Sequence, residues 1–547
     1  MIDRRSFLAL GAAVAAASAA SAAGCASAPG SSGSPAPGSP PGPEPEASRV
    51  DLEEATVADL SARMQRGEIT AESLVARYTE RIEALDRRGP ALTSILELNP
   101  EAPAIAAALD QERRAKGPRG PLHGIPVLIK DNIDTGDRML TTAGSLALAA
   151  APAPRDATIV AALRRAGAVI LGKANLSEWA NIRSTRSTSG WSARGGLVKN
   201  PYALDRNASG SSSGSAVAVA ASLAPIAVGS ETDGSIVSPA SICGVVGLKP
   251  TVGLVSRTGI IPISHTQDTA GPMARTVTDA ALLLGALAGP DALDPATASA
   301  PRGPVDYQKA LDPGAARGKR VGVVRNIPGI APEVQKIFEA AAADLTRLGA
   351  VLVDVTLPHL GEIDAPELSV LLHELKADMA SYLATRPPGG PRTLEDLVRW
   401  NEAHAADELR YFGQELFQQA LAKGPLDAPA YREALATCGK LARDEGIDKV
   451  LRDSSLDLLL APTGGVAWLS DLMNGDAFTG SSSTPAAVAG YPSITVPAGA
   501  LHGLPVGVSF FGRAYSEPLL LGVAFAYEQA TKHRARPTFP ASVRPDG

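Results

Sequence analysis

The feature that most constrains the fold is a repeated alternation of helical periodicity with short apolar runs. Residues 157–175, ATIVAALRRAGAVILGKAN, show a helical pattern, then Gly167, then an apolar run typical of a buried strand. The same order recurs in IFEAAAADLTRLGAVLVDVTL, and GIPVLIKD at residues 124–131 predicts another buried strand, with Lys130 near its end. Buried strands alternating with helices are typical of a covered sheet. We therefore predict an α/β fold, a single large α/β/α sandwich with a mixed, mostly buried β-sheet over residues 49–547.

Three further regions have recognisable local patterns. Apolar residues recur at helical spacing over residues 56–86 and are interrupted at Gly67, which predicts two helices at the edge of the fold. The sequence SITVPAGALHGLPVGVSFFG at residues 493–512 predicts a β-hairpin whose turn lies at residues 500–503. A helical region is expected at about residues 364–444, and it either packs as part of the fold or shapes a substrate cleft.

The N-terminal sequence differs from the rest of the chain. Residues 1–25, MIDRRSFLALGAAVAAASAASAAGC, combine a basic start with a weakly hydrophobic, alanine-rich segment, which is the layout of an export signal. Arg4 and Arg5 resemble a twin-arginine signal. Cys25 lies where a bacterial lipobox places a lipidated cysteine, and cleavage without a lipid is the alternative. Residues 26–48, rich in Pro, Gly and Ser, predict a linker. We expect a bacterial protein that is exported, either periplasmic or anchored to the membrane as a lipoprotein.

The composition argues against several classes of partner. The 547 residues carry a net charge of −6 without a block of Lys or Arg, so we expect no nucleic-acid partner. The 7 His residues are isolated and no Cys-x-x-Cys occurs, so we expect no metal site and no cofactor. Cys243 and Cys438 are predicted to be buried free thiols.

A serine-rich loop at residues 208–220, ASGSSSGSAVAVA, raises the question of a nucleophile. The loop runs directly into alternating Ala and Val, so its serines are expected to be held against the core. GSSSG matches the Gly-x-Ser-x-Gly nucleophile elbow, with Ser212 as nucleophile and His502 or His533 as base. An elbow needs a buried strand before it, whereas the preceding KNPYALDRNA is polar and turn-like. The elbow is therefore the weaker hypothesis.

A second candidate nucleophile lies in the sequence GSETDGSIVSPA. Ser235 follows a glycine in a predicted turn. Successive backbone N–H groups around Thr232, Asp233 and Gly234 could converge on an oxyanion. A serine hydroxyl is a poor nucleophile until a neighbouring base accepts its proton. Lys130 and the serine loop together would give a Ser-Ser-Lys arrangement.

Three blocks of the sequence together carry a resemblance: GIPVLIKDNID, ASGSSSGSAVAVAASLAPIAVGSETDGSIVSPASICGVVGLKPTVGLVS and DTAGPMAR. They closely resemble the amidase signature family over about residues 50–540, and GSETDGSIVSPA is most similar to the bacterial peptide amidases of that family, which remove the C-terminal amide from peptides. Asp233, Val237 and Ser209 depart from the broad family pattern, which bears on the substrate more than on the mechanism. The resemblance implies the amidase signature fold and these roles: Lys130 as the catalytic lysine, Ser211 as the bridging serine on a cis peptide, Ser235 as the nucleophile, Ser212 as support for the loop, and the backbone amides of Thr232, Asp233, Gly234 and Ser235 as the oxyanion hole.

A lysine acts as a base only when it is neutral. Its ordinary pKa of about 10.4 would have to fall by roughly 3 units, which burial can produce. On the predicted strand, Lys130 shares a face with Leu128, while Asp131 points to the other face and need not stabilise the ammonium. We expect Lys130 to accept a proton from Ser211, which in turn accepts one from Ser235. A lysine exposed to solvent at the strand end is the alternative.

Four nearby residues are expected to be structural. Ser213 and Ser215 are interpreted as a turn residue and a helix cap. Asp268 is interpreted as a turn or network residue rather than an acid catalyst, and Cys243 as a core residue.

The first hypothesis for function is an exported, monomeric, metal-free amidase. It would bind a small-molecule or peptide amide, release ammonia from C-terminally amidated peptides through an acyl-enzyme, and meet the membrane only through a lipid on Cys25. The alternative is an amidase or esterase for other small aryl or aliphatic amides. A surface lipoprotein that binds ligand without turnover is more remote. The family's transamidation role needs a cytoplasmic partner and charged tRNA, and the export signal argues against it.

Overall fold

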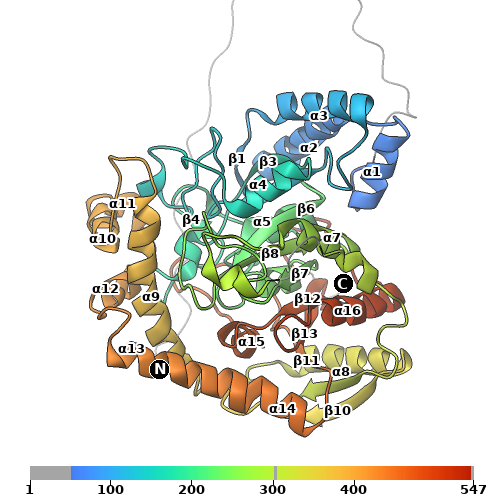
Figure 1. The fold of residues 1–547 in the computed structure, drawn as a ribbon, viewed down its shortest axis with the longest axis vertical. Coiled ribbons are helices and arrows are strands. Elements are labelled where there is room, and N and C mark those ends of the chain that lie inside the picture. The colour runs from blue at the N-terminus through green and yellow to red at the C-terminus, as the bar shows by residue number, and fades with distance from the viewer. Residues whose placement is uncertain (1–50, 301–304, 544–547) are drawn as a thin grey trace, which may run out of the picture. The chain divides into compact units, whose positions relative to one another are not determined.

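The computed structural model describes residues 51–300 and 305–543 (Figure 1). The predicted signal at residues 1–25, its Cys25 and the linker at residues 26–48 lie outside the described residues.

Eleven strands form one sheet, and a two-stranded ribbon lies apart from it. The strands of the sheet are β1 (Ile95–Leu98), β2 (Pro126–Lys130), β3 (Val169–Ala174), β6 (Ile226–Glu231), β7 (Val246–Lys249), β8 (Thr269–Ala274), β9 (Arg320–Val324), β10 (Val351–Val355), β11 (Leu458–Pro462), β12 (Ser493–Leu501) and β13 (Leu504–Phe511), and those of the ribbon are β4 (Trp191–Ser192) and β5 (Gly196–Leu197).

The sheet is mixed, as predicted. Its order is β1-β3-β2-β6-β8-β7-β12-β13-β11-β9-β10. Pairing is parallel between β3, β2 and β6 and between β11, β9 and β10, and it is antiparallel elsewhere. The central strands β2, β3, β6 and β8 are buried along their whole length, as expected for a covered sheet.

Helices precede, follow and interrupt the strands. The α-helices are α1 (Val57–Gln65), α2 (Ala71–Ile82), α3 (Ala102–Lys116), α4 (Thr158–Arg165), α5 (Ser213–Ala220), α6 (Val237–Ile242), α7 (Val277–Leu287), α8 (Pro332–Arg347), α9 (Asp364–Ala384), α10 (Leu394–Ala403), α11 (Ala405–Glu408), α12 (Glu415–Leu421), α13 (Pro429–Cys438), α14 (Asp448–Asp453), α15 (Thr484–Val488) and α16 (Glu517–Thr531). Two π-helical segments, η2 (Glu83–Arg87) and η7 (Gly439–Ile447), and four short 3₁₀ segments, η3 (Leu146–Leu148), η4 (Glu178–Asn181), η5 (Pro295–Ser299) and η6 (Tyr307–Ala310), complete the described elements.

The helices pack on both faces of the sheet. Both α5 and α7 pack against β6 and β8 without forming a helix pair, which places them on opposite faces. The set α7, α16 and α8 continues along one face toward β12 and β13. The helices α9 to α13 form a separate group at one side of the ribbon in Figure 1. The α/β sandwich inferred from the alternating pattern is thus confirmed.

Local predictions from the sequence hold with small shifts. The helices α1 and α2 replace the continuous pattern at residues 56–86, and Gly67 between them has φ +74°. The β12–β13 turn is tighter than predicted, because Leu501 still pairs with Leu504 and only residues 502–503 are left in the turn. Cys243 and Cys438 are both buried and free.

The strand β8 is not predicted by its sequence, TAGPMA. It contains Gly271 and Pro272, which normally disfavour a central strand because Pro lacks an N–H donor. The structure accommodates Pro272 because β7 pairs only with Met273 and Ala274, so no bond to β7 is required at the proline.

Replacing Gly214 with Ala is expected to destabilise the protein. A Cβ at this position in α5 would lie 2.2 Å from Ser94 O and 2.4 Å from Asn175 O. Ala normally stabilises a helix interior by about 1 kcal/mol relative to Gly, so the expected direction is the reverse of the helix preference. Chemical denaturation should show a loss of about 1–3 kcal/mol in the free energy of unfolding.

The matched control is Gly390→Ala, where the added Cβ would meet no atom within 4 Å. Its free energy of unfolding should change by less than about 0.5 kcal/mol. Equal stability of the two variants would contradict the close packing of α5.

Candidate active site

Lys130 is the last residue of β2, which lies between β3 and β6. Its side chain is fully buried. The amine Nζ donates to Ser211 Oγ at 2.8 Å, to Ser230 Oγ at 2.9 Å and to the Ser230 carbonyl at 3.1 Å. The lysine therefore contacts one hydroxyl of the serine loop and two oxygens at the end of β6, and the alternative of a solvent-exposed lysine is wrong.

Burial lowers the pKa of Lys130 from 10.5 to about 7, because the ammonium loses its hydration. The negative charges of Glu231 and Asp268 act in the opposite direction without cancelling this effect. Both carboxyls are themselves buried, and burial raises the pKa of Glu231 and brings that of Asp268 to about 6. The neutral amine is therefore well populated near neutral pH.

Ser211 lies in the loop before α5 and is fully buried. The peptide bond from Gly210 to Ser211 is cis. The Ser211 carbonyl accepts a hydrogen bond from Ser177 N at 3.1 Å, which holds the loop against the segment after β3. Within the described residues, the Ser211 hydroxyl contacts Lys130 but is not hydrogen bonded to the Ser235 hydroxyl. Catalytic hydrogen bonds are often long in the free enzyme and tighten in the complex.

Ser235 lies in the turn between β6 and α6. The four N–H groups of residues 232–235 donate no hydrogen bond to any other residue that the structure describes. Gly234 in this turn has φ +76°, and a Cβ there would lie 3.0 Å from Ser483 Oγ. The turn therefore requires glycine and presents unpaired donors beside the Ser235 hydroxyl.

Glu231, at the end of β6, orients this turn. Its Oε2 accepts hydrogen bonds from Ile236 N at 2.7 Å and from Val237 N at 3.0 Å. Burial raises the pKa of Glu231, and the charge of Lys249 partly opposes the rise. Lys249 is buried as well, and its pKa falls to about 8. Glu231 and Lys249 support the turn from the sheet, and the sequence analysis singled out neither of them.

Ser212 joins the serine loop to the end of β6. Its hydroxyl donates to the Ser230 carbonyl at 3.0 Å and accepts from Ser230 N at 3.2 Å. Its backbone N–H donates to the Ser235 carbonyl at 3.1 Å. These contacts are those of a residue that supports the loop.

The nucleophile elbow gains no support from the geometry. No strand leads into Ser212, which follows a bend in the chain. His502 lies in the β12–β13 turn, and His533 Nε2 lies 3.6 Å from Asp344 Oδ2. Neither histidine is hydrogen bonded to Ser212 in the described part of the chain.

Sequence reasoning missed Ser230 and Asn132. Ser230 Oγ accepts hydrogen bonds from Lys130 Nζ and from Asn132 Nδ2, both at 2.9 Å. The one available signal was position, since Asn132 follows Lys130 closely and Ser230 precedes the Ser235 turn. Position alone does not reveal this contact, because it depends on β2 pairing with β6 in the sheet.

The neighbouring serines are structural, with one correction. Ser213 Oγ donates to Ser209 O at 2.5 Å, as expected for a turn residue. Ser215 is not the helix cap, because α5 begins at Ser213 and Ser212 occupies the N-cap position. The Ser215 hydroxyl instead donates to Val228 O at 3.3 Å.

Asp268 is a network residue, as expected. Its Oδ1 accepts from Thr232 Oγ1 at 2.5 Å, and its Oδ2 accepts from Ile263 N at 2.8 Å and from Ser264 N at 2.9 Å. Asp268 therefore links the loop before β8 to the turn that carries Ser235.

A cavity of about 470 Å³ opens at Ser235. Its wall is rich in serine and threonine hydroxyls and contains the carboxyls of Asp233 and Asp476. Asp233 Oδ2 accepts from Thr484 Oγ1 at 2.6 Å. The cavity is large enough for a small-molecule or peptide end group, since such sites typically measure about 300–1,000 Å³.

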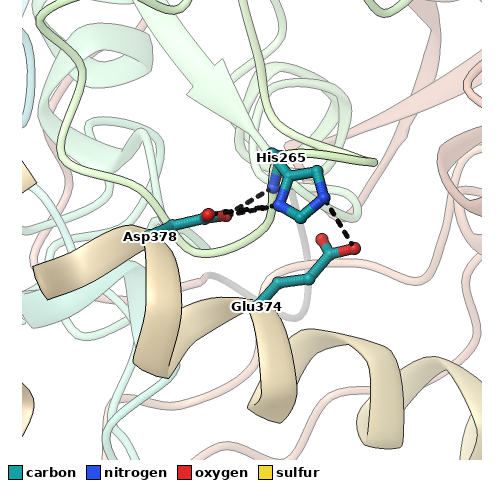
Figure 2. Close-up of side chains that lie close together, drawn as sticks. All are labelled: His265, Glu374 and Asp378. Carbon is teal, nitrogen blue, oxygen red and sulfur yellow. Dashed lines mark hydrogen bonds and ion pairs between the residues drawn. The ribbon is translucent and has the colours of Figure 1, made fainter. Parts of the chain in front are cut away.

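His265, Glu374 and Asp378 are the residues, within the part of the chain that the structure describes, that could share a metal ion. Figure 2 shows the imidazole between the two carboxylates of α9. Nδ1 lies 2.9 Å from Asp378 Oδ2 and Nε2 lies 3.4 Å from Glu374 Oε1, so the two nitrogens serve different partners. The hydrogen bond to Asp378 raises the pKa of His265, which burial opposes. We interpret this group as an ion-pair network that ties α9 to the loop before β8.

The fold and the lysine-serine geometry at its centre define an amidase. A family model described as Amidase matches residues 73–521. The chain therefore belongs to the amidase signature family, as the sequence resemblance indicated, and it is an amide-hydrolysing enzyme.

Individual relatives make the similarity more specific. The native peptide amidase from Stenotrophomonas maltophilia is 54% identical with a TM-score of 0.86, covering 89% of this chain and 99% of that one. A peptide amidase PAM in complex with the competitive inhibitor chymostatin is 54% identical with a TM-score of 0.85, covering 88% and 99%. A "Probable amidase At4g34880" from Arabidopsis thaliana is 41% identical over 506 residues, covering 90% and 93%.

The predicted bacterial, periplasmic or lipoprotein localisation is wrong. It is contradicted by eukaryotic relatives, which besides the Arabidopsis protein include putative amidases from Schizosaccharomyces pombe and Arthroderma benhamiae at 37% and 38% identity. The prediction rested on a short alanine-rich segment, whose weak hydrophobicity does not by itself establish an export signal. Among the helices of the described residues, none is long and apolar enough to cross a membrane.

Replacing Ser212 with Ala is expected to lower the melting temperature more than the activity. The variant loses a buried hydroxyl that serves both the N–H and the carbonyl of Ser230, and such losses cost about 1–3 kcal/mol. Ser215→Ala is the matched control, because it removes a single longer bond to Val228 O from the same segment. Thermal unfolding and amide hydrolysis should be measured on both. A Ser212→Ala protein that stays folded but hydrolyses nothing would instead favour the nucleophile elbow.

Proposed function

We propose that the protein hydrolyses the terminal carboxamide of C-terminally amidated peptides through a Ser235–Ser211–Lys130 triad. The observation that carries this proposal is the buried Lys130 amine, 2.8 Å from the Ser211 hydroxyl in the loop beside Ser235.

The contacts of Lys130 suit a neutral amine. A neutral amine has two N–H donors and one lone pair. The two donors match the Ser230 hydroxyl at 2.9 Å and the Ser230 carbonyl at 3.1 Å. The lone pair is then left to accept the proton of Ser211, which is the nearest of the three oxygens at 2.8 Å. Lys130 is therefore oriented as a general base.

In the proposed reaction, Ser235 Oγ forms a bond to the amide carbon while its proton passes to Ser211 and the proton of Ser211 passes to Lys130. The unpaired N–H groups of residues 232–235 stabilise the negative charge on the former carbonyl oxygen. The carbon–nitrogen bond then breaks, and ammonia leaves with a proton returned along the same path. Water adds to the acyl-enzyme, releases the free acid and restores the Ser235 hydroxyl.

Peptide amides are preferred as substrates because the relatives at 54% identity are peptide amidases. Localisation gives no argument against transamidation. Structural similarity does argue against it, since the glutamyl-tRNA(Gln) amidotransferase from Thermotoga maritima has a TM-score of only 0.66 at 30% identity. Other small aryl or aliphatic amides remain the alternative substrate class for the same triad.

Ser235→Ala is expected to abolish release of ammonia, with a fall in kcat of at least about a thousandfold. One peptide should be supplied with an amidated and with a free C-terminus, and the products should be weighed by mass spectrometry. Only the amidated form should change mass, by the conversion of amide to acid. Ser381→Ala, on the exposed side of α9, is the control and should retain wild-type activity. Full activity in Ser235→Ala would refute the assignment of the nucleophile.

The activity is expected to rise with pH through about 7. Lys130 is protonated below its pKa of about 7 and cannot accept a proton, whereas above that pH it is neutral and active. The profile of kcat/KM against pH should therefore show an acid limb near 7. Asp268→Asn should move this limb to lower pH, because the charge of Asp268 raises the pKa of Lys130. A limb that shifts upward or stays in place would assign the titration to another group.

A further inference from the structure

Exposed apolar side chains gather on one segment next to the cavity. Residues 468–478 connect β11 to α15, and within them Leu469 is 56% exposed, Met473 74% and Phe478 46%. In the described part of the chain the other exposed large apolar side chains are spread over separate elements: Leu293, Val351, Leu368 and Tyr515. A group of exposed apolar side chains beside a concave site is typical of a binding surface. Residues 468–478 are called the rim segment below.

The rim segment forms part of the cavity wall, together with the serine loop. Trp468, Asn474, Asp476 and Phe478 line the same cavity as Ser235. The Trp468 and Phe478 rings pack edge to face with centroids 5.5 Å apart. This part of the wall therefore presents aromatic and aliphatic surface, whereas the rest of the wall presents mainly hydroxyl groups.

The rim segment is held in place by the loop after η4. Asp476 Oδ1 accepts from Ser189 N at 3.1 Å and from Trp468 Nε1 at 3.2 Å. Arg186 Nη2 donates to Met473 O at 3.4 Å. The apolar surface is thus fixed relative to the cavity before any substrate binds, which reduces the entropy lost on binding.

The two parts of the cavity wall match the two parts of a peptide. Hydroxyl groups can hydrogen bond to the peptide backbone and fix its orientation, whereas apolar walls provide favourable burial for a side chain. The rim segment therefore lies where a side chain close to the scissile amide would be buried against aromatic and aliphatic surface.

We propose that the rim segment is the subsite for the side chain of the amidated residue and that it selects large apolar side chains. This inference rests on the proposed function, because the subsite is defined by its position beside Ser235. It names the substrate class more narrowly, as peptides whose amidated residue is aromatic or large and aliphatic.

The test measures kcat/KM of the full-length protein on peptides that differ only in the amidated residue, which is Phe, Leu, Ser or Gly. The Phe and Leu peptides should exceed the Gly peptide by about 10-fold or more, the order expected for apolar discrimination. Met473→Ser and Phe478→Ser should each lower the value for the Phe peptide more than that for the Gly peptide, mainly through KM. The preference should therefore shrink by about 10-fold.

The control variants are Leu293→Ser and Val351→Ser, which remove exposed apolar side chains that do not line the cavity. They should leave the preference for Phe over Gly unchanged. A wild-type enzyme that hydrolyses all four peptides equally, or rim variants that keep the preference, would overturn the subsite while the proposed function stands.

Two further outcomes would also overturn the subsite. If the wild type hydrolyses no amidated peptide, the proposed function and the subsite fall together, and the absence of turnover identifies this case. If the rim variants change the oligomeric state on size-exclusion chromatography but not the kinetics, the apolar surface serves a second copy of the chain and not the substrate.

Discussion

The active centre depends on removing one amine from water. Lys130 ends a strand that is covered on both sides of the sheet, so that its ammonium form loses hydration that no neighbouring carboxylate fully replaces. The two acidic residues that would stabilise the charge, Glu231 and Asp268, are engaged elsewhere through backbone N–H groups and the Thr232 hydroxyl. Any change that admits water to the end of β2 would raise the pKa of the amine and weaken the base.

The rest of the site is built around that amine from three separate stretches of chain. The β6 strand supplies Ser230, whose hydroxyl and carbonyl both face Lys130, and Ser212 holds the same residue from the other side. Glu231 then fixes the turn that follows, in which the four N–H groups remain unpaired. The arrangement explains why a buried carboxylate stands one residue beyond the lysine's main partner: it organises the turn through neutral donors rather than by pairing with the amine.

Much of this could be predicted from the sequence, and the rest could not for identifiable reasons. The alternation of helices with apolar runs predicted the sandwich, and the resemblance to the amidase family located Lys130, Ser211 and Ser235. Ser230 was missed because it reaches Lys130 across the sheet, through a pairing of β2 with β6 that no local pattern reveals. The strand β8 was missed because its proline violates a rule that holds only where both edges of a strand are paired.

The ion-pair network on α9 has a consequence for how the molecule tolerates change. Asp378 and Glu374 hold the loop at residues 264–266, and that loop continues into Asp268, which binds the hydroxyl of Thr232. The helical region is thus a brace whose far end reaches the turn around the nucleophile. An insertion or exchange of helices there would be felt at the catalytic centre, even though no side chain of α9 need touch the substrate.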